Sequence, residues 1–297
     1  MSEPWTVSRM LGWAAPFLSK YGSTSARLDA ELLLCNVTGM RRLDLYVDHE
    51  RPLQPDELAR FKDLVKRRAR QEPVAYILGR RAFHDIELLV GRGALVPRPE
   101  TEHLVDRALS WLAGKGAAVE GRVVDVGTGT GAIVLAMAKA LRGRGDRRPL
   151  GATDRSADAL GWAQRNAEAL GLTTEVELIR ADLLGPWKEP ASLAAVVSNP
   201  PYIRSARMAT LDETVRAFEP REALEGGADG LDVLRRLAAQ AVPALRPRGL
   251  FAVELGDADQ GRQLVQLLQG IGVTDARHDP IGPGPTAIVW GTRDLTT

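Results

Sequence analysis

The chain has 297 residues, and its 39 basic and 38 acidic side chains leave a formal net charge of +1 at pH 7. This near balance argues against a protein that coats nucleic acid, and the single cysteine excludes an intrachain disulfide. The sequence contains no long apolar run of the kind that predicts a transmembrane helix, and its first ten residues lack the apolar core of a signal peptide. We therefore expect a cytoplasmic protein without membrane partners, long enough for two domains.

The first 73 residues predict a small helical domain. Apolar side chains recur at helical spacing in three stretches, which predicts helices over residues 5–20, 25–39 and 55–71. The far side of the third helix carries basic side chains, among them Arg67, Arg68 and Arg70. They are compatible with a solvated helix face and with a docking surface for a partly acidic partner.

A β-hairpin is expected to link this domain to the next. Pro73 stops the third helix. Residues 75–78 and 83–90 then predict two extended segments, with Gly79 at the start of the turn between them. The linker therefore covers residues 74–93.

Strands alternate with helices in the second domain, which covers residues 94–297. Strands are expected over 122–126, 149–153, 176–180, 193–198, 250–255 and 286–291. Helices are expected over 101–113, 132–141, 156–170, 229–244 and 260–270. This alternation predicts an α/β fold, a Rossmann-like domain whose mostly parallel sheet is covered on both faces.

A glycine-rich turn follows the first strand of this domain and opens a helix. After Asp125 and Val126 come Gly127, Thr128, Gly129, Thr130 and Gly131. Glycines let the backbone turn tightly and let a ligand lie against bare peptide, while the helix N-terminus offers free N–H donors. The spacing fits a dinucleotide fingerprint with Ala132 in its last position, and it also fits the turn that binds S-adenosylmethionine. A tight turn without a ligand is the third interpretation.

Two carboxylates follow the next strands of the expected sheet. Asp154 ends the second strand and Asp182 follows the third. In both ligand interpretations, an acid at the first of these positions accepts hydrogen bonds from ribose hydroxyls. The structural alternatives are a helix cap at Asp154 and a turn cap at Asp182. Because ligands of such sheets bind outside the carboxyl ends of the strands, we expect both carboxylates near Gly127.

The segment Asn199-Pro200-Pro201-Tyr202 follows the strand at 193–198. Two prolines remove two backbone donors and stiffen the loop, although a plain proline turn is the structural alternative. The Asn199 side-chain oxygen and the Pro200 carbonyl can accept both hydrogens of a planar –NH2 group, and Tyr202 adds a flat face. Holding these hydrogens orients the nitrogen lone pair toward an electrophilic methyl group. Asn199 and Pro200 are the catalytic candidates, and no triad or metal-ligand cluster is predicted.

With these motifs, the chain closely resembles the release-factor glutamine methyltransferase (HemK/PrmC) family of S-adenosylmethionine-dependent enzymes. The matching segments are residues 71–79, 96–102, 125–133, 198–202, 218–220 and 230–232. The resemblance implies a helical substrate-recognition domain and a methyltransferase domain. It implies methyl transfer from S-adenosylmethionine to the glutamine side-chain amide of the Gly-Gly-Gln motif in class I peptide chain release factors.

The resemblance also implies roles for individual residues. Residues 127–131 and Asp154 would bind the methyl donor, and Asp182 with Leu183 would flank its adenine. Asn199 would reach both the donor and the substrate, and residues 199–202 would hold the substrate glutamine. The helical domain would help to grip the release factor, and residues 98–101 would lie near the active-site cleft. The chain departs from the family at 279–285, which is unusually rich in proline and glycine.

Other functions remain open at this point. A ribosomal-protein glutamine methyltransferase or a nucleic-acid amino methyltransferase would act on the same kind of –NH2 group. The near-zero net charge argues against direct nucleic-acid binding. An NAD-dependent oxidoreductase would explain the glycine turn and leave residues 199–202 unexplained. A binding module without catalysis would keep the nucleoside pocket alone.

Overall fold

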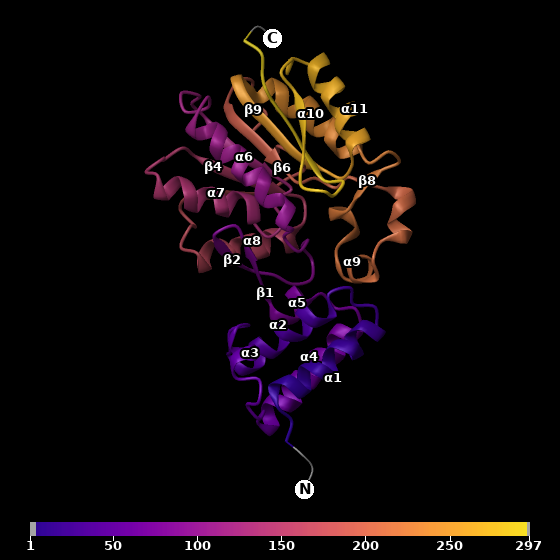
Figure 1. Cartoon of the computed structure of the whole chain (residues 1–297). Coiled ribbons are helices and arrows are strands. Elements are labelled where there is room, and N and C mark those ends of the chain that lie inside the picture. The colour runs from indigo at the N-terminus through magenta and orange to yellow at the C-terminus, as the bar shows by residue number, and fades with distance from the viewer. Residues whose placement is uncertain (1–3, 296–297) are drawn as a thin grey trace. The chain divides into compact units, whose positions relative to one another are not determined.

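A computed structural model describes residues 4–295, which form two compact units (Figure 1). The first unit contains the chain up to Arg80 together with the segment Asp212–Phe218. The second contains Arg81–Leu211 and the chain from Glu219 onward. Within the described residues, no helix is both long and apolar enough to span a bilayer.

The first unit is helical, as the spacing of its apolar residues predicts. Its helices are α1 (Val7–Lys20), α2 (Ala26–Thr38), α3 (Asp44–Val47), α4 (Pro55–Ala69) and α5 (Val74–Leu78). They bury a common core around Met10, Leu33 and Phe61. Gly39 ends α2 in the left-handed conformation with φ of 72°, which glycine adopts without strain.

One of the basic residues expected on the outer side of α4 is not exposed. Arg68 is buried, and its Nε donates to Asp29 at 2.7 Å. Ser23 and Ser25 donate to the same carboxylate at 2.7 and 2.8 Å, so the buried charges are fully paired. Arg67 pairs with Glu72. Arg68 therefore belongs to the interior of this unit. The basic surface predicted from Arg67, Arg68 and Arg70 does not include it.

The extended segment expected over residues 75–78 is wrong, because these residues form α5. Pro73 precedes the helix and Gly79, with φ of 71°, ends it. A four-residue apolar run does not distinguish a strand from a buried helical turn, and here it is a helical turn that buries Tyr76 and Ile77. The hairpin follows later, with β1 (Arg80–Phe83) and β2 (Ile86–Leu89) joined across His84 and Asp85.

The second unit has the α/β fold that the sequence predicts. Its main strands are β3 (Arg122–Val126), β4 (Leu150–Asp154), β5 (Val176–Arg180), β6 (Leu193–Ser198), β9 (Leu245–Leu255), β10 (Arg277–Pro280) and β11 (Ala287–Thr292). They form a sheet in the order β10-β11-β9-β6-β3-β4-β5, parallel from β9 to β5. The strands β10 and β11 are antiparallel, which gives the mostly parallel sheet that the sequence predicts.

Helices cover both faces of this sheet (Figure 1). They are α6 (Glu102–Ala113), α7 (Ala132–Gly143), α8 (Ala157–Ala169), α10 (Asp232–Ala244) and α11 (Ala258–Gly270). Side chains alternate along each strand, so Phe251, Val253 and Leu255 of β9 share one core with α10 and α11. The intervening Glu254 therefore faces the side of the sheet where α6 begins, which places a carboxylate behind the site described below.

The strand β10 was not predicted from the sequence. Residues 279–285 stand out in the sequence for their proline and glycine content, yet Asp279 and Pro280 pair with Ile288 and Ala287 of β11. Proline is tolerated at the end of an edge strand because no neighbouring strand needs its missing N–H. The turn itself follows, with Gly282 in the left-handed conformation.

Outside the main sheet, β7 (Ile203–Arg204) and β8 (Glu225–Gly227) pair with each other, and the segment that connects them lies between residues 204 and 225. It includes α9 (Glu213–Phe218), which belongs to the first unit. There the Thr214 hydroxyl donates to Gln71 at 3.0 Å and accepts from Arg68 at 3.3 Å. The chain then returns to the second unit at Glu219.

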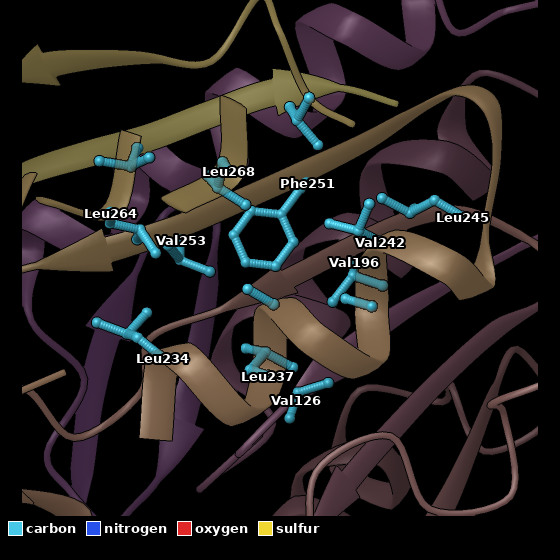
Figure 2. Close-up of a cluster of buried hydrophobic side chains, with 14 of the residues drawn as sticks. Val126, Val196, Leu234, Leu237, Val242, Leu245, Phe251, Val253, Leu264 and Leu268 are labelled. Atoms are coloured by element: carbon cyan, nitrogen blue, oxygen red, sulfur yellow. The ribbon is translucent and has the colours of Figure 1, made fainter. Parts of the chain in front are cut away.

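The core between the sheet and α10 and α11 centres on Phe251. Figure 2 shows its ring among Val196, Leu237, Val242 and Leu268, and all of these side chains are buried. The core holds the carboxyl ends of β3 and β6 against α10, and these ends carry the candidate site.

Replacing Phe251 with alanine should lower the free energy of unfolding of the second unit by about 3–5 kcal/mol, since the lost ring leaves a cavity. Leu295→Ala is the control, because this leucine is 64% exposed and should change stability by less than about 0.5 kcal/mol. Chemical denaturation measures both. Equal, small effects of the two substitutions would contradict the assignment of Phe251 to the core.

Candidate active site

A cavity of about 150 Å³ opens at the carboxyl ends of β3, β4 and β6. Eight of the residues predicted for the site line it: Gly127, Gly129, Asp154, Asp182, Leu183, Asn199, Pro200 and Pro201. Another four predicted residues are absent from its lining: Thr128, Thr130, Gly131 and Tyr202. The sheet therefore brings the separate sequence motifs to one place, as parallel strand ends do.

The first two glycines of the turn leave room against the cavity. Gly127 and Gly129 have φ of 72° and 59°, and a Cβ added to either would meet no atom within 4 Å. Gly131 differs, because its Cβ would lie 2.8 Å from a methyl of Leu135. A side chain at position 131 would therefore collide with α7, so Gly131 is needed for packing. Gly127 and Gly129 instead expose bare backbone to the cavity.

The two threonines of the turn are buried and hold its shape. The Thr128 hydroxyl donates to the Asp125 carboxylate at 2.6 Å. The Thr130 carbonyl accepts from the side-chain amide of Asn166 at 2.9 Å, and that amide also donates to the Leu89 carbonyl. These bonds join the turn to α8 and to the end of β2, so the turn is rigid.

Asp125 is an unusual group in the interior. Its Oδ2 accepts from Thr128 and from the Val134 N–H at 3.3 Å, while its Oδ1 has no hydrogen-bond partner among the described residues. Complete burial raises the pKa of Asp125 to about 7, the two hydrogen bonds oppose that rise, and the charge of Asp154 adds to it.

Asp154 lines the cavity and also supports the glycine turn. Its Oδ2 accepts from the Gly129 N–H and its Oδ1 from the Ser156 N–H, both at 2.9 Å. Burial raises the pKa of Asp154, and these backbone donors lower it. Ser156 is the N-cap residue of α8, and its hydroxyl accepts a hydrogen bond from the Ala159 N–H. The alternative role of Asp154 as a helix cap is therefore taken by Ser156.

Asp182 and Leu183 form the far wall of the cavity. Asp182 is exposed and pairs with Arg236 of α10. Leu183 adopts a positive φ of 53°, and its carbonyl accepts from the Thr153 hydroxyl at 2.6 Å. The strained backbone at Leu183 is thus tied to β4 beside Asp154.

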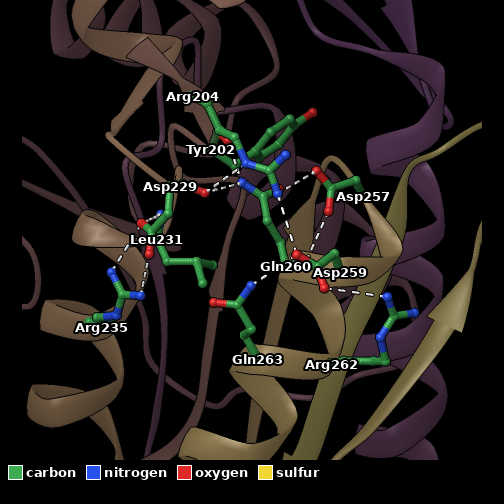
Figure 3. Close-up of polar contacts among 10 residues, drawn as sticks. All are labelled: Tyr202, Arg204, Asp229, Leu231, Arg235, Asp257, Asp259, Gln260, Arg262 and Gln263. Atoms are coloured by element: carbon green, nitrogen blue, oxygen red, sulfur yellow. Dashed lines mark hydrogen bonds and ion pairs between the residues drawn. The ribbon is translucent and has the colours of Figure 1, made fainter. Parts of the chain in front are cut away.

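The loop after β6 is fixed at both of its ends. At its start, the Ser198 hydroxyl donates to the Val126 carbonyl at 2.6 Å, which joins the residues directly before Asn199 and Gly127. At its other end, the Gln260 side-chain amide donates to the Tyr202 carbonyl at 2.8 Å and to the Asp229 carbonyl at 3.0 Å (Figure 3). The loop is therefore held by the sheet and by α11.

Tyr202 is partly buried and packs against the core that contains Phe251. Its hydroxyl donates to Oε1 of Glu254 at 3.1 Å. A Cβ on Gly256 would lie 2.7 Å from its ring, and a Cβ on Gly226 would lie 2.8 Å from its Cα and 2.7 Å from the Pro201 carbonyl oxygen. Both glycines are therefore needed for the loop to pack. Burial raises the pKa of Tyr202, and the neighbouring Glu254 adds to the rise, so the phenol stays protonated.

Asn199 reaches back to the segment before α6. Its side-chain amide nitrogen donates to the Thr101 hydroxyl at 3.0 Å, and that hydroxyl donates to Oε2 of Glu254 at 2.6 Å. Close by, one nitrogen of Arg98 contacts both oxygens of the buried Glu219 at 2.7 and 2.8 Å. This pair ties the segment to Pro220, which lines the cavity.

Sequence reasoning missed several of these supporting residues. Glu254, Gln260 and Glu219 were not singled out for any individual role. For Glu254 a signal exists: it is the one carboxylate in the apolar run from Leu250 to Leu255 that ends strand β9. Such a residue needs buried partners, which Thr101 and Tyr202 provide.

The cavity is lined by more acidic than basic groups. Four carboxylates line it, namely Asp154, Asp182, Glu222 and Glu225, against the two cations Arg155 and Arg236. Arg236 pairs with Asp182 and Arg221 pairs with Glu225, so the net negative charge that remains at the cavity is small. Its sign favours a cationic ligand over a pyrophosphate.

The chain is similar to known proteins over most of its length. Residues 9–79 match the PrmC N-terminal domain, and residues 103–227 match the methyltransferase small domain. Release factor glutamine methyltransferases from Rhodopirellula baltica and Geobacter sulfurreducens are 40% and 38% identical to the chain. The first alignment covers 85% of this chain and 84% of the relative, and the second covers 94% and 95%. The chain belongs to the release factor glutamine methyltransferase family.

Two solved structures have a similar fold to this chain, although their sequences are less similar to it than those of the relatives above. The catalytic domain of hMettl16 in complex with MAT2A 3′UTR hairpin 6 is 18% identical, with a TM-score of 0.55 over 79% of this chain and 84% of that one. The T. thermophilus 16S rRNA N2 G1207 methyltransferase in complex with AdoMet and guanosine is also 18% identical. Its TM-score is 0.51 over 72% of this chain and 49% of that one.

The buried carboxyl group of Asp125 predicts a pH dependence of stability. Its pKa is about 7 in the folded protein, above the ordinary value of 3.8, so the folded state binds the proton more tightly. The free energy of unfolding should therefore fall as the pH rises from about 4 to 7, with a slope approaching roughly 1.4 kcal/mol per pH unit. Asp125→Asn cannot titrate and should lack this contribution. Urea denaturation at pH 5 and pH 7 tests the difference, and parallel losses in both proteins would contradict it.

Proposed function

We propose that this enzyme transfers a methyl group from S-adenosylmethionine to the side-chain amide nitrogen of the glutamine in the Gly-Gly-Gln motif of class I release factors. The observation that carries the proposal is the position of Asn199 and Pro200 in the cavity wall, beside the exposed backbone of Gly127 and Gly129. Family membership supports the same substrate, since the relatives are named for it. Translation substrates also favour a cytoplasmic site of action.

The residues of the cavity fit S-adenosylmethionine. Gly127 and Gly129 leave space where a side chain would stand, and the Asp154 carboxylate suits ribose hydroxyls. Asp182 and Leu183 form the wall that would flank the adenine. The acidic lining suits a ligand with a sulfonium and an ammonium group, and it disfavours the pyrophosphate of NAD. When bound, this donor supplies an electrophilic methyl group.

The loop after β6 supplies acceptors for the substrate. Pro200 and Pro201 have no N–H, so this part of the loop presents only carbonyl oxygens. The Tyr202 carbonyl is taken by Gln260, and the Pro201 carbonyl lies against Gly226. We therefore assign the Pro200 carbonyl and the Asn199 side-chain oxygen to the two hydrogens of the glutamine amide.

The chemistry follows from these two acceptors. An amide nitrogen is a poor nucleophile because its lone pair is delocalised into the carbonyl. Fixing both hydrogens directs the lone pair out of the acceptor plane and favours pyramidalisation, so orientation supplies much of the rate enhancement. As the N–CH3 bond forms, the S–CH3 bond breaks and the donor leaves as S-adenosylhomocysteine. The methylated nitrogen then loses its surplus proton to solvent water, so a strong base is not required. Tyr202 supports the loop from inside through its bond to Glu254.

A methyl-transfer assay with labelled S-adenosylmethionine tests the proposed function. The substrates are an intact class I release factor, the same factor with alanine in place of the Gly-Gly-Gln glutamine, unmethylated DNA, and ribosomes. We expect label on the intact factor alone. Label on DNA or on ribosomes instead would replace the proposed substrate by one of the alternatives, and NADH binding without donor binding would establish the oxidoreductase.

Substitutions at Asn199 and Asp154 should separate substrate activation from donor binding. Asn199→Ala removes one of two acceptors and should lower kcat on the order of 100-fold, the scale of a lost transition-state hydrogen bond, with little change in donor Kd. Asp154→Ala should instead weaken donor binding by about 1–3 kcal/mol. Single-turnover kinetics and calorimetry measure the two effects. A collapse of donor binding in Asn199→Ala would show that Asn199 serves the donor, and an unchanged Kd in Asp154→Ala would remove Asp154 from the donor site.

A further inference from the structure

Three side chains form one hydrogen-bonded chain behind the cavity wall. Glu254 comes from β9, Thr101 from the turn before α6, and Asn199 from the loop after β6. Thr101 donates to Glu254 at 2.6 Å and accepts from the Asn199 amide nitrogen at 3.0 Å. Thr101 and Glu254 are only 4% and 1% exposed, so water does not replace these partners.

The direction of these bonds is fixed by counting protons. A threonine hydroxyl has one hydrogen to donate. An ionised carboxylate only accepts, so the Thr101 hydrogen must go to Glu254. The hydroxyl can then offer Asn199 only a lone pair, and the Asn199 group that faces it must be the –NH2. The carbonyl oxygen of the Asn199 side chain is therefore left for the cavity side.

We propose that Thr101 and Glu254 are positioning residues that determine which end of the Asn199 carboxamide faces the substrate. The inference rests on the proposed function, in which the Asn199 oxygen accepts a hydrogen from the glutamine amide. The reversed carboxamide would turn its own –NH2 toward the substrate –NH2. Two donors would then face each other, and one of the two acceptors for the reacting nitrogen would be lost.

The surroundings of Glu254 keep the arrangement in place. The Tyr202 hydroxyl donates to its other oxygen, so each carboxylate oxygen has a hydrogen-bond donor. Of the charged groups that act on it, Arg98 favours the ionised form and Glu100 opposes it. Burial raises the pKa of Glu254, and the bonds from Thr101 and Tyr202 lower it. Protonation of Glu254 would let it donate to Thr101 and would release the Thr101 hydrogen toward Asn199.

Two substitutions of Thr101 separate this role from packing. Thr101→Val keeps the volume and removes the hydroxyl, whereas Thr101→Ser keeps the hydroxyl and removes a methyl group. We expect Thr101→Val to lower kcat on the release factor by roughly 10- to 100-fold, with donor Kd unchanged, because the reacting groups are misoriented. Thr101→Ser should restore most of the turnover. If Thr101 serves packing alone, serine would be the damaging substitution and valine the mild one, which would overturn the proposal.

The pH dependence of kcat provides the readout for Glu254. At saturating donor and release factor, the wild type and Thr101→Ser should lose turnover as the pH falls through the pKa of Glu254. The kcat of Thr101→Val should not show this acidic limb, the fall of kcat at low pH, because without the hydroxyl no hydrogen bonds connect Glu254 to Asn199. The same limb in all three proteins would overturn the role of Glu254. A wild type that methylates no release factor would overturn the proposed function, whereas an active wild type with an unaffected Thr101→Val variant would overturn this inference alone.

Discussion

A buried carboxylate must be paired, and Glu254 meets this requirement with two hydroxyls from different parts of the chain. Thr101 binds one oxygen and Tyr202 the other, so a single side chain on β9 holds the segment before α6 and the loop after β6. The same pairing determines the orientation of Asn199 through the hydroxyl of Thr101. Other contacts hold the same loop at further points. For example, the Gln260 side-chain amide donates to the Tyr202 carbonyl.

The parallel sheet explains why distant motifs form one cavity. The glycine turn, Asp154 and Asn199 each follow a strand that ends at the same edge. The hydrogen bond from the Ser198 hydroxyl to the Val126 carbonyl fixes the spacing between the glycine turn and the loop that begins at Asn199. In the proposed function, methyl transfer to an amide depends on this spacing, because the protein contributes mainly orientation.

Much of this account could be predicted from the sequence, because glycine turns, proline pairs and strand-end carboxylates carry local signals. Residues 75–78 were mistaken for a strand because a short apolar run fits both a strand and a helical turn. The buried pair of Arg68 with Asp29 was missed because its partners are 39 residues apart. Thr101 and Glu254 are 153 residues apart, and Tyr202 was expected in the cavity because an aromatic ring fits a flat ligand. Pairings of this kind depend on tertiary contacts, which one sequence does not encode as a local pattern.

A crystal structure with S-adenosylhomocysteine and a peptide that contains Gly-Gly-Gln would show which atoms hold the glutamine amide. We expect the glutamine side-chain nitrogen at about 3 Å from both the Asn199 carboxamide oxygen and the Pro200 carbonyl oxygen. The Asn199 side-chain nitrogen should remain hydrogen-bonded to the Thr101 hydroxyl. A glutamine nitrogen that contacts neither acceptor, or an Asn199 side chain engaged only with the donor, would contradict the account.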